Sequence, residues 1–184
     1  MTNFAHLRCA FLDRDGCINR PPPSGYVTRA DEMELLPEAA GAILQLNKAG
    51  IKVVVVTNQH CIHQGLCTEA DLAAIHERMC QLLSREGAHI DAIYYCPHGR
   101  DCRVCRKPAT GMFERAFSDF PEITPETSVT IGNAVSDIEA GLRAGTRTIL
   151  ITDAAPGNGL CCDAVVLSLG EAVGLMLAGV KGVV

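Results

Sequence analysis

Two carboxylates follow the first apolar run of the chain at a spacing that suits one reacting centre. Asp13 and Asp15 come directly after the segment 8–12, and residues i and i+2 of an extended segment point to the same side. One carboxylate can attack phosphorus to form an aspartyl-phosphate, while the other protonates the departing alcohol and then activates the hydrolytic water. The pair therefore predicts a centre for phosphoryl transfer.

An anionic nucleophile that approaches an anionic phosphoryl group needs positive charge beside it. Lys107 is the candidate for part of that charge, and the Thr57 hydroxyl with neighbouring amides can donate hydrogen bonds to the phosphoryl oxygens. A Mg²⁺ ion held by oxygen ligands supplies the rest. These residues together predict a magnesium-dependent site.

Short runs of β-branched residues alternate with longer segments of helical period, which is typical of a parallel sheet covered by helices. The sequence predicts a doubly wound α/β fold: a mainly parallel sheet, helices on both faces and no large cap domain. The expected strands cover residues 8–12, 51–56, 90–95, 129–131, 148–151 and 164–167. The expected helices cover residues 38–49, 68–85, 111–120, 137–144 and 171–177.

Polar residues follow the first four expected strands where each strand ends. In open α/β sheets ligands bind beyond the carboxyl ends of the strands, so such residues share one rim although they are far apart in the chain. The fragments are 13–16, 57–59, 96–98 with 106–108, and 132–133 with Asp137. Their convergence predicts a single active site.

Composition narrows the class of protein. The 184 residues carry 16 basic and 21 acidic side chains, a formal net charge of -5, which is the wrong sign for gripping nucleic acid. The first ten residues have no apolar signal region, so the ten cysteines are expected to be mostly reduced and the protein cytoplasmic. Its longest apolar stretches are shorter than the roughly 20 residues that cross a bilayer. We expect one domain over residues 1–184, a monomer, with a small phosphorylated substrate as its partner.

Three cysteines and one histidine fall within the ten residues 96–105: Cys96, His98, Cys102 and Cys105. This is the ligand set of a closed tetrahedral zinc site, and it predicts a structural Zn²⁺ ion in the loop after the third strand. Arg106 and Lys107 come directly after Cys105, so zinc would order the loop that positions them. The alternative is a reduced loop with incidental cysteines.

Six motifs resemble those of the haloacid dehalogenase superfamily of Mg²⁺ phosphatases, most closely its heptose 1,7-bisphosphate phosphatases and next its histidinol-phosphate phosphatases. They are FLDRDG at 11–16, SGYV at 24–27, VVVTNQ at 54–59, YYCPH at 94–98, CRKP at 105–108 and IGNAVSD at 131–137. The reaction implied is removal of the 7-phosphate of a heptose 1,7-bisphosphate through an aspartyl-phosphate, with histidinol phosphate as the alternative substrate.

The resemblance also implies a role for each matching residue. Asp13 is the nucleophile, Asp15 the general acid and base, and Lys107 orients and neutralises the phosphoryl group, while Thr57 and Asn58 bind that group and Arg106 holds a substrate phosphate. The Mg²⁺ ligands implied are Asp13, the backbone carbonyl of Asp15 and the residue at position 133.

Position 133 departs from the family pattern, which has an acidic residue there. Asn133 offers a carbonyl oxygen but no negative charge, so the affinity for Mg²⁺ should fall. Three explanations stay open: Asp137 compensates as a Mg²⁺ ligand, the chain is a weakened or regulatory relative, or the residue was changed to trap a complex. A second departure is the segment 60–65, in which His60 and His63 are expected as solvated loop side chains.

Two other classes of protein share part of this residue pattern. A non-enzymatic receiver domain also places carboxylates, Thr and Lys at strand ends, but its acceptor Asp would follow the third strand, where this chain has Cys96 to His98. A catalytically silent, zinc-bearing binding protein on the phosphatase scaffold is favoured only by Asn133.

Overall fold

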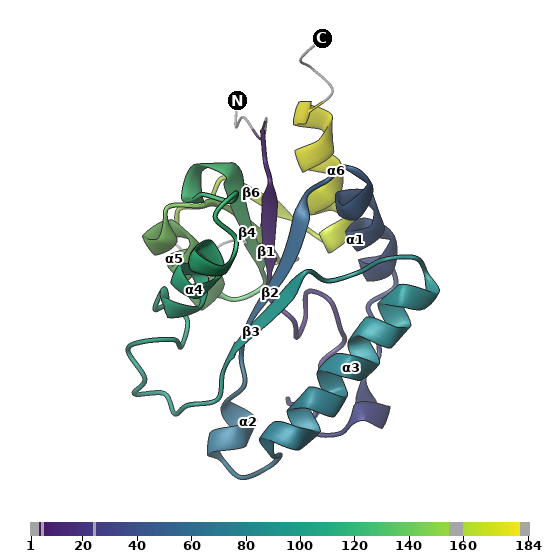
Figure 1. The fold of residues 1–184 in the computed structure, drawn as a ribbon, viewed down its shortest axis with the longest axis vertical. Coiled ribbons are helices and arrows are strands. Elements are labelled where there is room, and N and C mark those ends of the chain that lie inside the picture. Colours follow the sequence, from purple (N-terminus) through teal and green to yellow (C-terminus); the bar gives the residue numbers. More distant parts are fainter. Residues whose placement is uncertain (1–3, 5, 24, 155–159, 181–184) are drawn as a thin grey trace.

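One six-stranded parallel sheet forms the centre of the fold (Figure 1). The structure is a computed structural model that describes residues 4, 6–23, 25–154 and 160–180, so Ser24 of the SGYV motif lies outside the described residues. The strand order is β3-β2-β1-β4-β5-β6, and every neighbouring pair is parallel. The strands are β1 Cys9–Leu12, β2 Lys52–Asn58, β3 Ala92–Cys96, β4 Ser128–Gly132, β5 Arg147–Ile151 and β6 Ala164–Val166.

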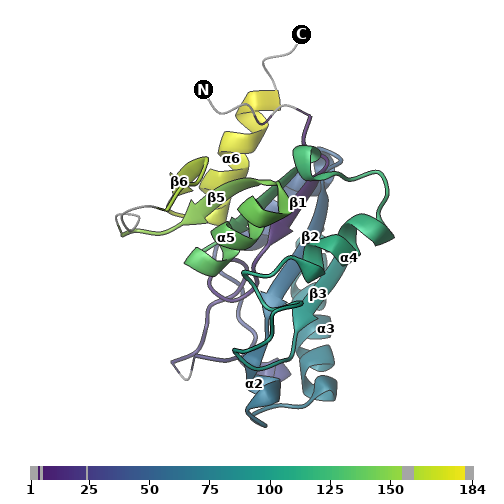
Figure 2. The same ribbon diagram turned by 90° about the vertical axis from the view of Figure 1, so that its left-hand side faces the viewer.

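Helices cover both faces of the sheet, which confirms the expected doubly wound fold (Figures 1 and 2). Helices α1, α3 and α6 lie on one face, and α4 and α5 lie on the other. The helices are α1 Ala39–Lys48, α2 His60–His63, α3 Glu69–Arg85, α4 Gly111–Asp119, α5 Val135–Ala144 and α6 Leu169–Val180, with 3-10 turns at Ala30–Glu32 and Pro125–Thr127. No helix in the described part of the chain has both the length and the apolar character to cross a bilayer.

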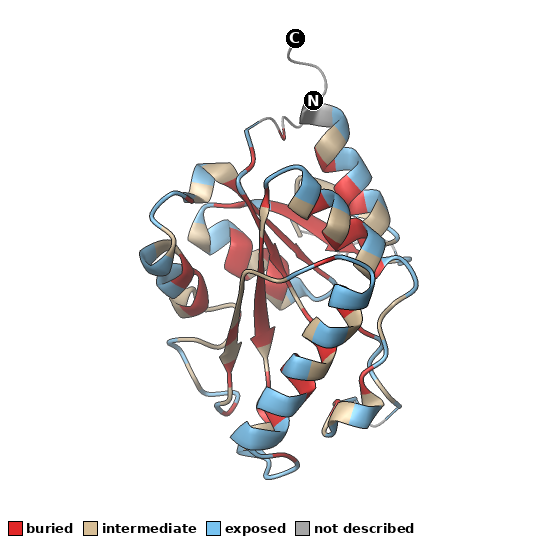
Figure 3. Cartoon of the chain, turned by 45° about the vertical axis from the view of Figure 1, so that its right-hand side comes forward, coloured by how far each residue is buried: buried red, intermediate tan, exposed pale blue. Residues whose placement is uncertain are grey.

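The core explains why β2 is apolar at consecutive positions. Val53 and Val55 pack into the cluster under α1, α3 and α6, whereas Val54 and Val56 pack into the cluster under α4. Both faces of a parallel strand are buried, so its sequence does not alternate between apolar and polar residues. Figure 3 shows the result, with buried strands between helices that are buried on one side only.

The strand order indicates where on the sheet a ligand would bind. Strand β1 lies between β2 and β4, and the chain winds outward from β1 in both directions. Ligands in such sheets bind outside the carboxyl ends of the two strands where the order reverses. That crevice is bounded here by Asp13, which follows β1, and by Gly132, the last residue of β4.

Element boundaries differ from the sequence-based expectation by a few residues in several places, and α6 is longer than expected, Leu169–Val180 instead of 171–177. Three differences concern elements next to the site. Strand β2 runs to Asn58, so Thr57 and Asn58 belong to the strand. Helix α5 begins at Val135 instead of at Asp137. Ala134 is its N-cap residue, and Asp137, in the first turn, accepts the Ala134 N–H at 3.0 Å. Helix α2 was not expected, since a single turn shows no helical periodicity in the sequence.

Candidate active site and metal centre

The Lys107 ammonium is buried between two carboxylates at the rim of the sheet. Its Nζ lies 2.7 Å from Asp13 Oδ1 and 2.7 Å from Asp137 Oδ1, and it donates to the Val56 carbonyl at 2.6 Å. Three acceptors match the three N–H groups of an ammonium. Burial alone would lower the pKa of Lys107, but Asp13 and Asp137 outweigh burial and raise it. Lys107 is therefore a fixed cation beside Asp13.

Asp13 is held at the end of β1 with its side chain still reachable. Its backbone N–H donates to the Ile131 carbonyl at 2.9 Å, and 12% of its side chain is exposed. Burial raises the pKa of Asp13 to about 6; Lys107 opposes this shift and Asp137 adds to it. A carboxylate that is poorly solvated and partly exposed has the character of a nucleophile.

The Asp15 carboxylate accepts hydrogen bonds from three side chains. Arg14 Nη2 lies 2.8 Å from Oδ2 and 3.1 Å from Oδ1. Asn19 Nδ2 donates to Oδ1 at 3.0 Å, and Gln59 Nε2 donates to Oδ2 at 3.0 Å. Both oxygens are therefore satisfied in the ionised form, although 23% of the side chain remains exposed.

Thr57 and Asn58 have different partners. The Thr57 hydroxyl is buried and accepts from Gln59 Nε2 at 2.9 Å. The Asn58 amide instead makes two hydrogen bonds to the backbone of Lys107. Asn58 Nδ2 donates to the Lys107 carbonyl at 3.1 Å, and Asn58 Oδ1 accepts from the Lys107 N–H at 3.0 Å. The contacts of Asn58 therefore hold the backbone of the lysine, and its expected role in phosphoryl binding stays a prediction.

Asn133 lies against the turn that follows β1. Gly16 has φ of +84°, a conformation that favours glycine, and a Cβ at this position would lie 2.2 Å from Asn133 Nδ2, so a larger residue would displace the Asn133 amide. Asp13, Asn133 and the backbone carbonyls of this turn offer oxygen donors of the kind that Mg²⁺ prefers. Both oxygens of Asp137 are engaged, Oδ1 by Lys107 and Oδ2 by the Ala134 N–H.

Arg106 lines a basic recess next to Lys107. Its Nη1 is buried and has no hydrogen-bond partner among the described residues. The recess has a volume of about 150 Å³, and its lining residues are Arg100, Cys102, Arg103, Arg106, Lys107, Pro108, Ala109 and Arg143. Four arginines and one lysine among the lining residues make the recess suitable for an anion.

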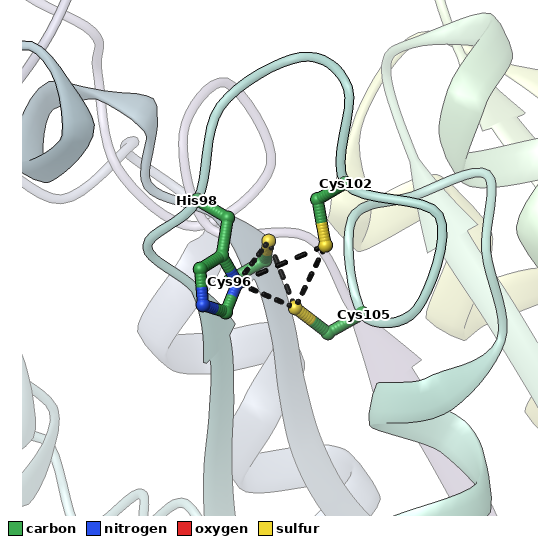
Figure 4. Close-up of side chains that lie close together, drawn as sticks. All are labelled: Cys96, His98, Cys102 and Cys105. Carbon is green, nitrogen blue, oxygen red and sulfur yellow. Dashed lines mark hydrogen bonds between the residues drawn. The ribbon is translucent and has the colours of Figure 1, made fainter.

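The four predicted zinc ligands converge (Figure 4). One ligand atom from each of Cys96, His98, Cys102 and Cys105 lies within 4.8 Å of the others. Backbone N–H groups of residues 105, 104 and 106 lower the pKa of Cys102 to about 6, which favours the thiolate that binds metal. The donor set and its compactness fit a tetrahedral Zn²⁺ site.

The expectation that His60 is solvated is wrong. Helix α2 turns its side chain inward, so that only 8% of the residue is exposed. Its ring stacks on that of His63 at 5.3 Å between centroids, and its Nδ1 lies 3.4 Å from the His98 carbonyl oxygen. His63 is exposed, as expected.

Three residues at the site have contacts that the sequence alone did not predict: Arg14, Gln59 and His76. Arg14 and Gln59 belong to recognised motifs, and their polar character at strand ends was the available signal. His76 had a fainter signal, as a histidine on the buried stripe of α3 that otherwise consists of Leu72, Ile75, Met79 and Leu83.

Comparisons with known proteins agree with the geometry. The sequence model of the family described as polynucleotide kinase 3 phosphatase matches residues 8–158. D-glycero-alpha-D-manno-heptose-1,7-bisphosphate 7-phosphatase of Mycobacterium tuberculosis is 38% identical over 135 residues, which cover 73% of this chain and 71% of that protein. The corresponding beta-heptose enzyme of Pseudomonas putida is 38% identical over 147 residues, or 79% of this chain and 82% of that protein.

Solved structures of heptose 1,7-bisphosphate phosphatases are also similar to this chain. The crystal structure of D,D-heptose 1,7-bisphosphate phosphatase from B. bronchiseptica, complexed with magnesium and phosphate, superposes with a TM-score of 0.83 at 30% identity, covering 94% of this chain and 99% of that one. The enzyme of the same name from Burkholderia thailandensis gives a TM-score of 0.70 at 29% identity, covering 93% and 99%. The chain therefore belongs to the polynucleotide kinase 3 phosphatase family and is a phosphatase of the haloacid dehalogenase superfamily.

Proposed function

We propose that this chain removes the 7-phosphate of a D-glycero-D-manno-heptose 1,7-bisphosphate. The observation that carries the proposal is the pairing of Lys107 with Asp13 next to the recess lined by Arg106. Two neighbouring places for anions suit a substrate with two phosphates, one to be hydrolysed and one to be held. The sugar is taken from the activities of the relatives described above.

The residues divide the reaction into two steps. An oxygen of Asp13 forms a bond to phosphorus, the bond from phosphorus to the sugar oxygen breaks, and Asp15 gives its proton to that oxygen. Asp15 then takes a proton from water, the water oxygen bonds to phosphorus, and the bond to Asp13 breaks to release inorganic phosphate. Lys107 and the Thr57 hydroxyl stabilise the phosphoryl oxygens in both steps.

Both metals fit the side chains available. Asp13, the Asp15 carbonyl and the Asn133 amide oxygen would hold Mg²⁺, and Asp137 stays a predicted ligand that must share its carboxylate with Lys107. Bound Mg²⁺ supplies positive charge to the phosphoryl oxygens. Cys96, His98, Cys102 and Cys105 would hold a structural Zn²⁺ ion.

The test measures phosphate release with Mg²⁺ from both anomers of the heptose bisphosphate, from the two heptose monophosphates and from histidinol phosphate. We expect the highest kcat/KM for a bisphosphate, a product that retains the 1-phosphate by ³¹P NMR, and loss of turnover in Asp13→Asn. A preference for histidinol phosphate would show that the substrate is histidinol phosphate instead of the heptose bisphosphate. If no ester released phosphate in the presence of Mg²⁺, the proposed phosphatase activity would be wrong.

Asn133 favours a second candidate function, binding of the phosphorylated sugar with weakened turnover. An amide brings no negative charge to the cation, so the ion would be held less firmly. Tight binding of the bisphosphate together with turnover that Asn133→Asp raises would support this candidate. Full turnover of the unmodified chain at low millimolar Mg²⁺ would exclude it.

A further inference from the structure

His76 is a buried titratable side chain to which the reaction scheme gives no task. Only 8% of the residue is exposed, and its Nε2 lies 3.1 Å from Arg14 Nη1. The N–H groups of arginine only donate, so Nε2 is the acceptor and the ring proton is on Nδ1. Burial lowers the pKa of His76 to about 4, which keeps this acceptor available.

Arg14 connects His76 to Asp15. The Arg14 side chain is fully buried: Nη1 lies next to His76 Nε2, while the two N–H groups of Nη2 are shared among both oxygens of Asp15 and Gln59 Oε1, which lies at 3.1 Å. Its Nε has no partner in the described part of the structure. The planar guanidinium is therefore anchored at two points, and His76 is the anchor on the side away from Asp15.

The anchoring matters because Asp15 has to direct its proton. Its hydrogen-bond contacts in the described part of the structure come from N–H groups of Arg14, Asn19 and Gln59, and none of these groups can accept a proton. When Asp15 carries a proton, the O–H must therefore point away from these donors and toward the exposed side of the carboxylate, which is the side open to a substrate. A guanidinium that tilts would turn the carboxylate and misdirect this O–H.

We propose that His76 is a positioning residue for the phosphatase reaction, which acts through Arg14 to set the direction of the Asp15 carboxylate. The inference rests on the proposed function, in which Asp15 protonates the leaving alcohol. His76 does not touch substrate, and its removal should slow proton delivery without weakening substrate binding.

The test compares two leaving groups in the first turnover. An alkyl alcohol needs a proton to leave, whereas p-nitrophenolate leaves without one, so only the alkyl ester should respond to a misdirected acid. In His76→Phe we expect the first-turnover release of the sugar alcohol to fall by at least about tenfold, with the p-nitrophenolate burst rate within about twofold of wild type. His76→Gln, whose Oε1 can replace Nε2 as acceptor, should restore the alkyl rate.

Three variants separate the possible outcomes. Asp15→Asn should show the same selective loss; an equal loss on both esters in this variant would overturn the acid assignment of the proposed function. A selective loss in Asp15→Asn with an equal loss in His76→Phe would overturn the role of His76 alone. Leu83→Ala truncates another buried side chain of α3, two turns away, and should lower stability without changing the ratio of the two rates.

A further variant, Arg14→Lys, covers the case in which His76→Phe does not fold. Arg14→Lys keeps the charge, but an ammonium cannot donate to His76 and Asp15 in the geometry of a guanidinium. It should show the same selective loss as His76→Phe. Parallel rates on the two esters in Arg14→Lys would contradict the proposal.

Discussion

Lys107 and Asp13 are 94 positions apart in the chain, and their side chains meet with 2.7 Å between Nζ and Oδ1. Two further interactions fix the position of Lys107. Asp137 accepts a hydrogen bond from the same ammonium, and the Asn58 amide hydrogen-bonds to the backbone of Lys107. The cation beside the nucleophile is thus placed by residues from β2 and α5 together with its own loop. Removing the charge should therefore affect stability as well as catalysis.

Lys107→Met leaves the carboxylates of Asp13 and Asp137 buried without their shared partner. We expect the free energy of unfolding to fall by about 3–5 kcal/mol at pH 7 and turnover to fall roughly 10²- to 10³-fold. Denaturant titration and steady-state kinetics measure the two effects. Lys52→Met is the matched control, since Lys52 also pairs with two carboxylates, Asp91 and Glu122, but is partly exposed. It should cost about 1 kcal/mol or less and leave turnover unchanged, and similar losses in both variants would contradict this account.

Asn133→Asp should strengthen the magnesium site. One additional carboxylate among the oxygen donors is expected to tighten Mg²⁺ binding by roughly tenfold and to raise turnover at limiting Mg²⁺. Isothermal titration calorimetry with Mg²⁺ gives the affinity without any need for activity. Gln81→Glu makes the same change of charge on the exposed face of α3 and should leave the affinity alone. Identical Mg²⁺ titrations of Asn133→Asp and wild type would refute the expectation.

Loss of zinc should loosen substrate binding before it unfolds the sheet. Three of the four ligands lie in the loop that follows β3, Cys96 is the last residue of that strand, and Cys105 is followed directly by Arg106 and Lys107. We expect one zinc ion per chain by metal analysis, and a raised KM after chelation or in Cys102→Ser while the sheet keeps its thermal transition. Cys80→Ser, outside the cluster, should retain zinc and KM. Unchanged kinetics in a sample shown to lack zinc would contradict this role.

His76 should make stability depend on pH. Burial lowers its pKa from 6.5 to about 4 in the folded chain, so between these values the unfolded chain binds a proton that the folded chain does not. Its contribution to stability is fully present above pH 6.5 and is lost as the pH falls toward 4, by roughly 2 kcal/mol at pH 5. Urea titrations at pH 7 and pH 5 should therefore show a smaller difference for His76→Gln than for wild type. His89→Gln, at an exposed position, should behave as wild type, and equal slopes for all three proteins would rule out the effect.

The fold could be predicted from the sequence because burial on both faces leaves a direct trace in each strand. Four consecutive valines at 53–56 mark β2, and Thr68 with Asp71 marks the start of α3, where the capping box is present. The α-helix that the sequence did not predict, α2, is one turn long and leaves no periodic pattern. The early start of α5 was also hidden, since Ala134 has no side chain that can cap a helix.

The sequence by itself determined that Asp13, Asp15 and Thr57 share one rim, because parallel strands end on the same side whatever their side chains do. Lys107 lies in the loop between β3 and α4, so its place at that rim depends on the path of this loop. The sequence also placed three thiols and an imidazole close enough in the chain to meet. Only the tertiary structure decided which side chains contact one another. Lys107 pairs with Asp137, Asn58 with the backbone of Lys107, and His76 with Arg14. Those contacts depend on the path of loops and the rotamers of buried side chains, and neither leaves a periodic signal in the sequence.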